Sequence, residues 1–301
     1  MLQKPFLKWL GGKTQIIETV MNHFPKEMDN YHEPFLGGGS VLMALLSYQK
    51  DKRILINKKI YAYDLNEDLI HLYQNIQKKP SELSRYLTYY FEEYDSLEVD
   101  VINRNPKSII EAKSSKESYY YWIRNLFNQM ENKTIEKSAL FLFLNKTCFR
   151  GMFREGPTGF NVSYGHYTQK HAIITENELF IISDLIKEVT FIHSDFNNSM
   201  KNVLKDDFIY LDPPYAPESK TSFVGYTPKG FNLDTHNMLF NYLKNLKNKK
   251  IKFCMSNANV DLVQNIFSES NGYKLTTLTT KRRINSKKPN QTTTELLIVN
   301  F

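Results

Sequence analysis

Residues 207–215 read Asp-Phe-Ile-Tyr-Leu-Asp-Pro-Pro-Tyr, a short apolar run that leads directly into an acidic residue and two prolines. The apolar part predicts a strand, and a Pro-Pro pair commonly ends a strand because proline fixes φ and lacks the backbone N–H. The stretch therefore predicts a strand that stops at Asp212 and presents the next few residues at its carboxyl end.

Further strand-like runs occur on both sides of this one, and most of them end at a glycine or at an acidic or polar residue. They cover residues 31–35, 59–63, 188–193, 251–255, 273–280 and 293–301. Helical patterns separate most of these runs, and this alternation predicts an α/β fold with a mostly parallel sheet covered on both faces. The last two runs share a short basic connection, which predicts an antiparallel hairpin at one edge.

The interval between Asp64 and Glu188 is too long for a single crossover. It contains a helical stretch, a polar Asn/Lys/Ser-rich segment, a second helical stretch and a Gly-rich segment, at residues 65–91, 100–118, 119–146 and 147–167. We therefore predict an inserted domain at residues 70–185. Residues 1–69 and 186–301 then form the domain that carries the sheet.

The bulk composition limits the class of protein. The chain has 301 residues, a formal net charge of +7 and a pI of about 9.0, which favours a polyanionic partner. Cys148 and Cys254 lack metal-ligand spacing, so we predict buried free thiols in a reducing compartment. No apolar run approaches the roughly 20 residues of a membrane span, and the first five residues have no signal-peptide core, so a soluble intracellular protein is expected.

The tetrapeptide Asp212-Pro213-Pro214-Tyr215 offers the groups needed to methylate an exocyclic amine of a nucleobase. The Asp212 carboxylate and the Pro213 carbonyl can each accept one N–H of the amine, which draws its lone pair out of conjugation with the ring. Tyr215 can stack on the base. A strand that simply ends in a proline turn is the alternative.

A second candidate site is the segment at residues 33–39, Glu-Pro-Phe-Leu-Gly-Gly-Gly, which lies between a predicted strand and a predicted helix. Its glycines let the backbone approach a ligand, and the helix N-terminus favours negative charge. Asp64, at the end of the next strand, could hold ribose hydroxyls. A tight turn without a ligand is the alternative, and the missing G-x-G-x-x-G order argues against a dinucleotide.

Two further motifs are weaker. Residues 6–13, Phe-Leu-Lys-Trp-Leu-Gly-Gly-Lys, could clasp a small zwitterion, although Trp9 could equally be a core anchor and Lys13 a solvated charge. Asp195-Phe196 follows a strand directly and can hydrogen-bond to and pack against an adenine ring, while a helix N-cap at Asp195 is the alternative.

Two segments are candidates for contact with DNA. Residues 145–165 mix Arg, Asn, aromatic residues and turn glycines, the composition of a hairpin that enters a DNA groove, where Arg pairs with guanine and Asn with adenine. Its candidate DNA-binding residues are Arg150, Met152, Arg154 and Asn161. In the C-terminal hairpin turn, Lys281, Arg282 and Arg283 would contact phosphates. A solvated loop is the alternative for each segment.

In their order along the chain, these segments resemble the Dam-type (D12 class, alpha group) DNA adenine-N6 methyltransferases over nearly the whole length. The resemblance implies a Rossmann-like class I methyltransferase sheet and an inserted, mainly helical target-recognition domain that carries a β-hairpin. It also implies S-adenosyl-methionine as the methyl donor, double-stranded DNA as the partner and no metal. The methyl group would be transferred to N6 of an adenine flipped out of the duplex.

The resemblance also implies roles for residues of this chain. Trp9, Gly11 and Lys13 would clasp the methionine end of the cofactor, Asp64 its ribose, and Asp195 with Phe196 its adenine. Further implied cofactor-binding residues are Glu33, Phe35, Gly37, Gly39 and Asp212. The implied catalytic residues are Asp212, Pro213, Pro214 and Tyr215. The loop at residues 216–234, with Ser222, Phe223 and Tyr226, would close over the flipped base.

The chain departs from the family pattern within residues 145–165. Members that read GATC usually carry Asn where this chain has Arg150, whereas Arg154 fits the family's guanine-reading Arg. Ser163 stands where a Pro is usual. We therefore expect GATC or a related short site.

Other functions stay open. They are an RNA adenine methyltransferase and a non-catalytic DNA-binding regulator with the same fold, while the glycine spacing disfavours a nicotinamide-dependent oxidoreductase. A cognate restriction endonuclease is a functional partner that the sequence leaves open. We expect a monomer or weak dimer in the cytoplasm or nucleoid.

Overall fold

A computed structural model describes residues 2–98, 101–131, 133–167, 169, 171–217, 231–281 and 292–301. The chain divides into two compact units. The first contains Met1–Lys4, Lys13–Leu65 and Glu188–Phe301, and the second contains Pro5–Gly12 and Asn66–Lys187. The second unit thus extends slightly beyond the predicted insertion at residues 70–185, and it includes a short segment from near the N-terminus.

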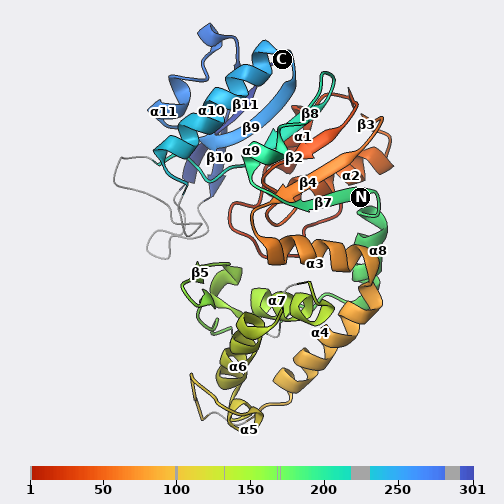
Figure 1. The fold of residues 1–301 in the computed structure, drawn as a ribbon, viewed down its shortest axis with the longest axis vertical. Helices are drawn as coiled ribbons and strands as arrows, with labels where there is room; N and C mark the ends of the chain where they lie inside the picture. The colour runs from red at the N-terminus through yellow and green to blue at the C-terminus, as the bar shows by residue number, and fades with distance from the viewer. Residues whose placement is uncertain are drawn as a thin grey trace. The chain divides into compact units, whose positions relative to one another are not determined.

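The first unit is built on a seven-stranded sheet with the strand order β10-β11-β9-β8-β2-β4-β7 (Figure 1). The strands are β2 (Tyr31–Glu33), β4 (Ile60–Asp64), β7 (Val189–His193), β8 (Phe208–Leu211), β9 (Lys252–Ala258), β10 (Lys274–Lys281) and β11 (Thr292–Val299). The strands from β9 to β7 pair in parallel, and β11 is antiparallel to both β9 and β10. The predicted α/β, Rossmann-like sheet with an antiparallel C-terminal hairpin is therefore confirmed.

The chain enters this sheet at β2, in its middle, and moves outward through β4 to β7. It then returns to the other side of β2 to form β8 and β9. The strand order therefore reverses between β2 and β8. In open α/β sheets, ligands bind outside the carboxyl ends of the strands at such a switch point.

β8 shows why the sheet is covered on both faces. Phe208 and Tyr210 contact Phe24, which follows α1 (Ile17–Asn22). Ile209 and Leu211 point to the opposite face and join the core cluster that includes α10 (Leu233–Asn248). Figure 1 shows α10 lying across this end of the sheet. Alternation in a strand that is buried on both faces produces the continuous apolar run seen in the sequence.

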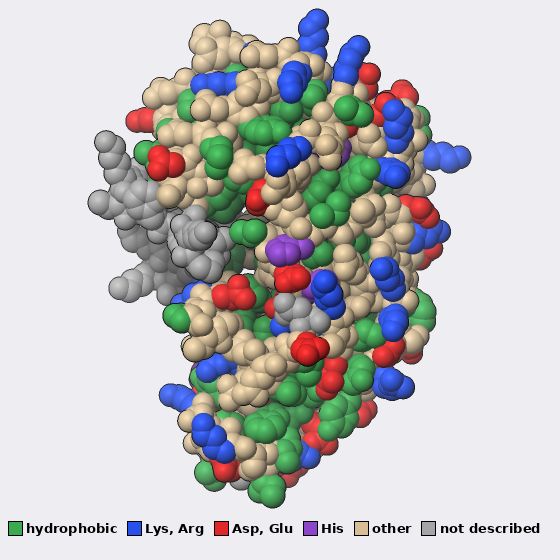
Figure 2. Space-filling view, in the orientation of Figure 1, with side chains coloured by type: hydrophobic (Ala, Val, Ile, Leu, Met, Phe, Trp, Pro, Cys, Tyr) green, Lys and Arg blue, Asp and Glu red, His purple; other side chains and the backbone are tan. Residues whose placement is uncertain are grey.

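Shorter elements complete the first unit. They are β1 (Glu27–Met28), α2 (Ser40–Lys50), β3 (Leu55–Ile56), α9 (Phe196–Ser199), α11 (Asp261–Gln264) and η2 (Glu269–Asn271). α1 contacts α2, and β1 pairs in parallel with β3. None of the helices in the described part of the chain is long and apolar enough to span a membrane. Figure 2 shows Lys and Arg side chains spread over the visible face.

The second unit is mainly helical and is organised around α7 (Ile135–Thr147). Nearly all of α7 is buried, as expected for a helix that is apolar on every side. The other elements are α3 (Glu67–Lys78), α4 (Pro80–Asp95), α5 (Ile109–Ala112), α6 (Lys116–Gln129), η1 (Phe149–Gly151), β5 (Glu155–Gly156), β6 (Gly159–Phe160) and α8 (Glu176–Leu185). The single helix expected at residues 65–91 is two helices, because Pro80 takes the first position of α4, where no N–H is needed.

The N-terminal segment Pro5–Gly12 is held in the second unit by two residues of α7. The backbone N–H of Lys8 donates to Asn145 Oδ1 at 3.0 Å, and Asn145 Nδ2 donates back to the Lys8 carbonyl at 2.7 Å. Lys146 Nζ donates to the Phe6 carbonyl at 2.7 Å. The Asn145 amide thus satisfies both backbone groups of Lys8, as a neighbouring strand would.

Candidate active site and recognition hairpin

Acidic residues stand at or directly after the carboxyl ends of four neighbouring strands in the first unit. Glu33 ends β2, Asp64 ends β4, Asp212 follows β8, and Asp195 lies two residues after β7. The four strands are adjacent in the order β8-β2-β4-β7. Because they are parallel, their carboxyl ends share one edge of the sheet.

The glycine turn after β2 is closed by Asp64. The Gly37 N–H donates to Asp64 Oδ2 at 2.8 Å, and the Leu36 N–H donates to the Tyr63 carbonyl at 2.8 Å. Gly37 and Gly39 have φ values of 50° and 66°, which favour glycine. α2 begins directly after Gly39, whose lack of a side chain leaves the start of the helix without a side-chain cap. Such a helix start offers backbone N–H groups to a ligand.

A buried ion pair lies at the end of β8. Lys13 Nζ is 2.8 Å from Asp212 Oδ2 and 4.0 Å from Glu295 Oε2, and the Lys13 side chain is only 3% exposed. The same ammonium lies 5.0 Å from the centre of the Tyr215 ring. Lys13 is therefore not a solvated charge but the cation of a cluster that contains two predicted catalytic residues. We call Lys13, Asp212, Tyr215 and Glu295 the catalytic corner.

Three contacts hold the residues that follow Asp212. His236 Nε2 lies 3.1 Å from the Pro214 carbonyl, the Tyr215 hydroxyl donates to Glu295 Oε2 at 2.6 Å, and the Ala216 N–H donates to Asn257 Oδ1 at 3.0 Å. No described residue donates a hydrogen bond to the Pro213 carbonyl. The loop is thus held on both sides of Pro213, which is itself buried.

Burial shifts the titration of the acids in this region. The pKa of Glu33 is raised to about 8, chiefly by burial and also by the carboxylates of Asp212 and Asp64, while the hydrogen bond from Tyr31 lowers it. The pKa of Asp212 is also raised by burial, and Lys13 opposes that shift. This end of the sheet therefore holds more acidic groups than Lys13 can balance.

Asp195 and Phe196 have local partners. Asp195 is the N-cap of α9, where its Oδ1 accepts from the Asn198 N–H at 2.8 Å, the alternative that the sequence left open. Phe196 is buried in the core and stacks on Phe35 with ring centres 5.8 Å apart. Phe231 packs against both rings. Their predicted contacts with the cofactor stay predictions.

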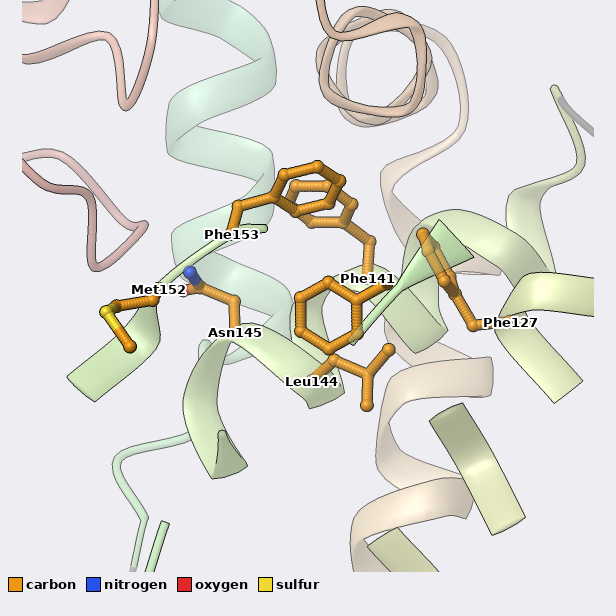
Figure 3. A pocket seen from close by; sticks show the side chains of 7 residues that line it. Phe127, Phe141, Leu144, Asn145, Met152 and Phe153 are labelled. Carbon is orange, nitrogen blue, oxygen red and sulfur yellow. The ribbon is translucent and has the colours of Figure 1, made fainter. Parts of the chain in front are cut away.

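Trp9 and Gly11 belong to the second unit. Trp9 stacks on Phe153 and on Phe141, with ring centres 6.1 Å and 6.4 Å away. Figure 3 shows Phe141 and Phe153 side by side at a small pocket, which Asn145 and Met152 also line. Trp9 is thus an aromatic anchor within this unit, and its predicted role at the cofactor stays a prediction.

Residues 148–165 form a hairpin, which we call the recognition hairpin, whereas the first three residues of the segment predicted at 145–165 are the end of α7. The outer part of the hairpin is the pair β5 and β6, and its base is closed by a bridge between Cys148 and Tyr164. Between these points, Arg150 and Gly151 both adopt left-handed backbone conformations, with φ values of 57° and 65°. A Cβ atom at Gly151 would lie 2.3 Å from Lys8 Cβ, so only glycine fits there.

The structure brings the predicted base-reading residues together at the open end of this strand pair, with Arg154 directly before β5 and Asn161 directly after β6. Arg154 Nε donates to Asn161 Oδ1 at 2.7 Å, and the Asn161 N–H donates to the Arg154 carbonyl at 3.0 Å. Arg154 is exposed, whereas Arg150, Met152 and Asn161 are half-buried. Arg154 Nη2 also donates to the Asn161 carbonyl at 3.4 Å, so Asn161 orients the guanidinium through two of its nitrogens.

Some predicted residues fall outside the described part of the chain. They are Ser222, Phe223, Tyr226, Arg282 and Arg283. Lys281 is the last residue of β10.

Three residues that hold the loop after Asp212 were not predicted from the sequence, namely His236, Asn257 and Glu295. Glu295 left a signal, because it is a charged residue directly before the apolar run Leu-Leu-Ile-Val of the last strand. His236 and Asn257 lie at the start of a helix and near the end of a strand, where polar residues are common. Only the sheet pairing brings them close to Asp212.

Comparison with known proteins agrees with this geometry. The family of D12 class N6 adenine-specific DNA methyltransferases matches residues 9–284. Type II methyltransferase M.MjaIII of Methanocaldococcus jannaschii is 35% identical, with 99% of each chain covered. DNA adenine methylase of Haemophilus influenzae is 30% identical over 99% of this chain and 93% of its own, and that of Vibrio cholerae is 31% identical over 85% and 81%.

The family match spans most of the chain, including the glycine turn, the recognition hairpin and the catalytic loop. The resemblance seen in the sequence is thereby confirmed, as is the prediction of an adenine-specific DNA methyltransferase. The chain belongs to the D12 class of N6 adenine-specific DNA methyltransferases.

Proposed function

We propose that this enzyme transfers a methyl group from S-adenosyl-methionine to N6 of an adenine flipped out of a short duplex site, GATC or a related sequence. The observation that carries the proposal is the buried Lys13–Asp212 pair, 2.8 Å long, which adjoins the Pro-Pro-Tyr loop at the switch point of the sheet. This is where a donor and an amine can both meet preorganised polar groups.

The residues at this edge fit S-adenosyl-methionine. Glu33 keeps its proton because burial raises its pKa to about 8, and Asp212 and Asp64 add further acidic groups, so a cation among them would offset their mutual repulsion. The left-handed glycines of the turn carry no Cβ that would block a ligand. When bound, S-adenosyl-methionine supplies an electrophilic methyl group on a positively charged sulfur.

Several residues would hold this cofactor. Asp64 and the turn at Gly37 and Gly39 would bind its ribose and approach it closely, and Glu33 would face its positive charge. Phe35, Asp195 and Phe196 would contact the adenine, with Lys13 at the methionine end. These assignments rest on the family resemblance and on the chemistry of the side chains.

The chain's own groups would activate the target amine. The Asp212 carboxylate accepts one N–H and the Pro213 carbonyl accepts the other, which localises the lone pair on nitrogen. Lys13 opposes the rise in the pKa of Asp212 that burial causes, and it fixes the direction of its carboxylate. Asp212 then accepts the proton that the amine loses after it has gained the methyl group.

Tyr215 would receive the base. The hydroxyl of Tyr215 is tied to Glu295, which holds the far end of the ring on which a flipped base can stack. An adenine inside a duplex cannot reach a buried carboxylate, and flipping is therefore physically required. The recognition hairpin, with Arg154 and Arg150, would select the site from the major groove.

The test is long-read sequencing of plasmid DNA from cells that express the protein, with N6-methyladenine scored at every adenine. An Asp212→Ala variant of equal abundance is the control. One methylated motif that is absent from the control supports the proposal and identifies the site. Equal methylation in both samples would sink it, and folded protein that methylates only RNA would point to RNA as the substrate.

A further inference from the structure

The C-terminal hairpin contributes one charged side chain to the catalytic corner. Glu295 lies on β11 opposite Ala258, the last residue of β9. The residues that follow it, Leu296 to Val299, are buried in the core, and the Glu295 side chain is itself only 14% exposed. A carboxylate in this position loses hydration, so it needs strong partners to remain charged.

Glu295 finds those partners in two residues of the proposed active site. Its Oε2 accepts from the Tyr215 hydroxyl at 2.6 Å and lies 4.0 Å from Lys13 Nζ. Lys13 in turn is 2.8 Å from Asp212. One oxygen of Glu295 therefore connects the tyrosine ring to the ammonium that orients Asp212.

This connection has two physical consequences. A hydroxyl-to-carboxylate hydrogen bond is short and strong, so it anchors the hydroxyl end of the Tyr215 side chain. In addition, Lys13 faces two carboxylates, and only part of its charge stabilises Asp212. The groups that face Asp212 are Lys13, Glu295, Tyr215, Tyr210 and Glu33. Among these groups, Glu295 is the one whose removal would change both the anchoring of Tyr215 and the Lys13–Asp212 ion pair.

We propose that Glu295 is a positioning residue for adenine methylation, which anchors the hydroxyl end of the Tyr215 side chain and sets how strongly Lys13 holds Asp212. The proposal rests on the proposed roles of Asp212 and Tyr215. Glu295 itself touches neither the base nor the methyl donor, and it acts through these two residues.

Three variants separate the two consequences. Tyr215→Phe removes the hydroxyl but keeps the ring and the charge of Glu295. Glu295→Gln keeps an oxygen that can accept from Tyr215 but removes the charge, and Glu295→Ala removes both. Glu269→Gln is the matched control, because Glu269 is an exposed glutamate of the same unit.

Single-turnover rates on a methylatable duplex are measured for each variant over a range of pH. We expect Tyr215→Phe and Glu295→Ala each to slow methyl transfer by about tenfold to a hundredfold, as small losses of positioning do. A variant that combines Tyr215→Phe with Glu295→Ala should be no slower than Glu295→Ala alone, because both changes break the same contact.

Glu295→Gln has a distinct signature in the pH profile. The charge of Glu295 raises the pKa of Asp212, so its removal should move the acidic limb of the rate profile to lower pH. A side chain that only stabilised the fold would leave this limb in place. Glu269→Gln should change neither the rate nor the limb.

The outcomes are separable from failure of the proposed function. If the wild-type protein transfers no methyl group to any duplex, the proposed function fails before the variants are compared. If the wild type is active and Tyr215→Phe and Glu295→Ala act additively, or if the limb does not move in Glu295→Gln, the positioning role is wrong. Should Glu295→Ala not fold, the Phe and Gln variants decide alone.

Discussion

The catalytic corner and the recognition hairpin use charge in opposite ways. In the catalytic corner, Lys13 and Asp212 form an ion pair in which the lysine side chain is 3% exposed and the aspartate 22%. In the recognition hairpin, Arg154 is exposed and is held by a neutral amide, that of Asn161. In the first region the cation is buried against carboxylates of its own unit, whereas in the second region the cation is exposed.

This difference matches two tasks. Preorganised dipoles in an active site stabilise developing charge without reorganising, and in the proposed function those of the catalytic corner would act on the target adenine whatever sequence surrounds it. A base edge, by contrast, must be met by donors that are not already satisfied. Changes in the catalytic corner should therefore alter rate at every site equally, and changes in the hairpin should alter which sites are chosen.

The largest expected effect comes from removing the Asp212 carboxylate from the catalytic corner. Asp212→Ala removes an acceptor of the amine and leaves Lys13 without its closest carboxylate, so methyl transfer should fall by about a thousandfold or more. Single-turnover kinetics measure the rate, and fluorescence anisotropy with duplexes of different sequence measures the preference in binding.

The variant should retain the wild-type preference among duplexes and some affinity for S-adenosyl-methionine. Asp184→Asn, an exposed change in the other unit, serves as the control. Substantial residual turnover by Asp212→Ala would remove Asp212 from its assigned role.

The next prediction tests whether the acidic groups gathered around Glu33, at the carboxyl edge of the sheet, lower the free energy of unfolding. The pKa of Glu33 is about 8 in the folded chain, against an ordinary value of 4.5, so between these values the folded state keeps a proton that the unfolded state has lost. Wild-type stability should therefore fall as pH rises through this interval. Glu33→Gln titrates no proton and keeps an acceptor for Tyr31, so it should be more stable than the wild type near pH 8, by roughly 1–3 kcal/mol.

Thermal unfolding of both proteins without cofactor, from pH 5 to pH 8, measures this difference. The gap in Tm should widen steadily with pH. A gap that is constant, or that narrows, would mean that Glu33 is ionised in the folded protein.

Breaking the hairpin should have a smaller and more selective effect. Arg154→Ala removes donors suited to a bidentate guanine contact, which costs about 1–3 kcal/mol and relaxes one position of the site. Sequencing of methylated DNA shows the relaxed position directly. Arg85→Ala, at an exposed arginine on α4, is the control in the same unit. Equal loss at all sequences would show that Arg154 contacts only phosphate.

The smallest effect sharpens the comparison within the hairpin. Arg150 has φ 57°, a conformation that asparagine adopts at lower cost. Arg150→Asn should raise the free energy of unfolding by up to about 1 kcal/mol and should also change the methylated motif. Denaturant unfolding and sequencing measure the two results.

Lys133→Asn is a matched control for this change, because Lys133 also has a positive φ, of 75°, outside the hairpin. It should gain stability and leave the motif unchanged. Loss of stability in Arg150→Asn would mean that contacts of Arg150 outweigh its backbone strain.

The sheet was predictable because its strands are short apolar runs with marked ends. The runs at residues 59–63 and 188–193 became β4 and β7 with shifts of one residue, and the hairpin of β10 and β11 followed from its basic connection. The family was predictable because its motifs keep their order. The break at Pro80 carried a signal that the prediction of one helix at residues 65–91 did not use.

The supporting contacts of the site were not predictable from local sequence. Glu295 follows Tyr215 by 80 positions, and the two meet only because β11 turns back beside β9. Asn145 likewise lies 137 positions from Lys8, and its amide pairs with a backbone that shows no strand pattern. Such contacts depend on tertiary pairing, which periodicity and spacing do not encode.

The two hydrogen bonds between the Asn145 amide and the backbone of Lys8 have a consequence for engineering. The second unit is assembled from two separate pieces of chain, and Asn145 and Lys146 have their partners in the shorter piece. A graft of residues 66–187 alone into another family member would pair these side chains with a foreign segment. Exchange of sequence preference between relatives should therefore succeed when Pro5–Gly12 is transplanted together with Asn66–Lys187. The two segments should be transferred as one unit.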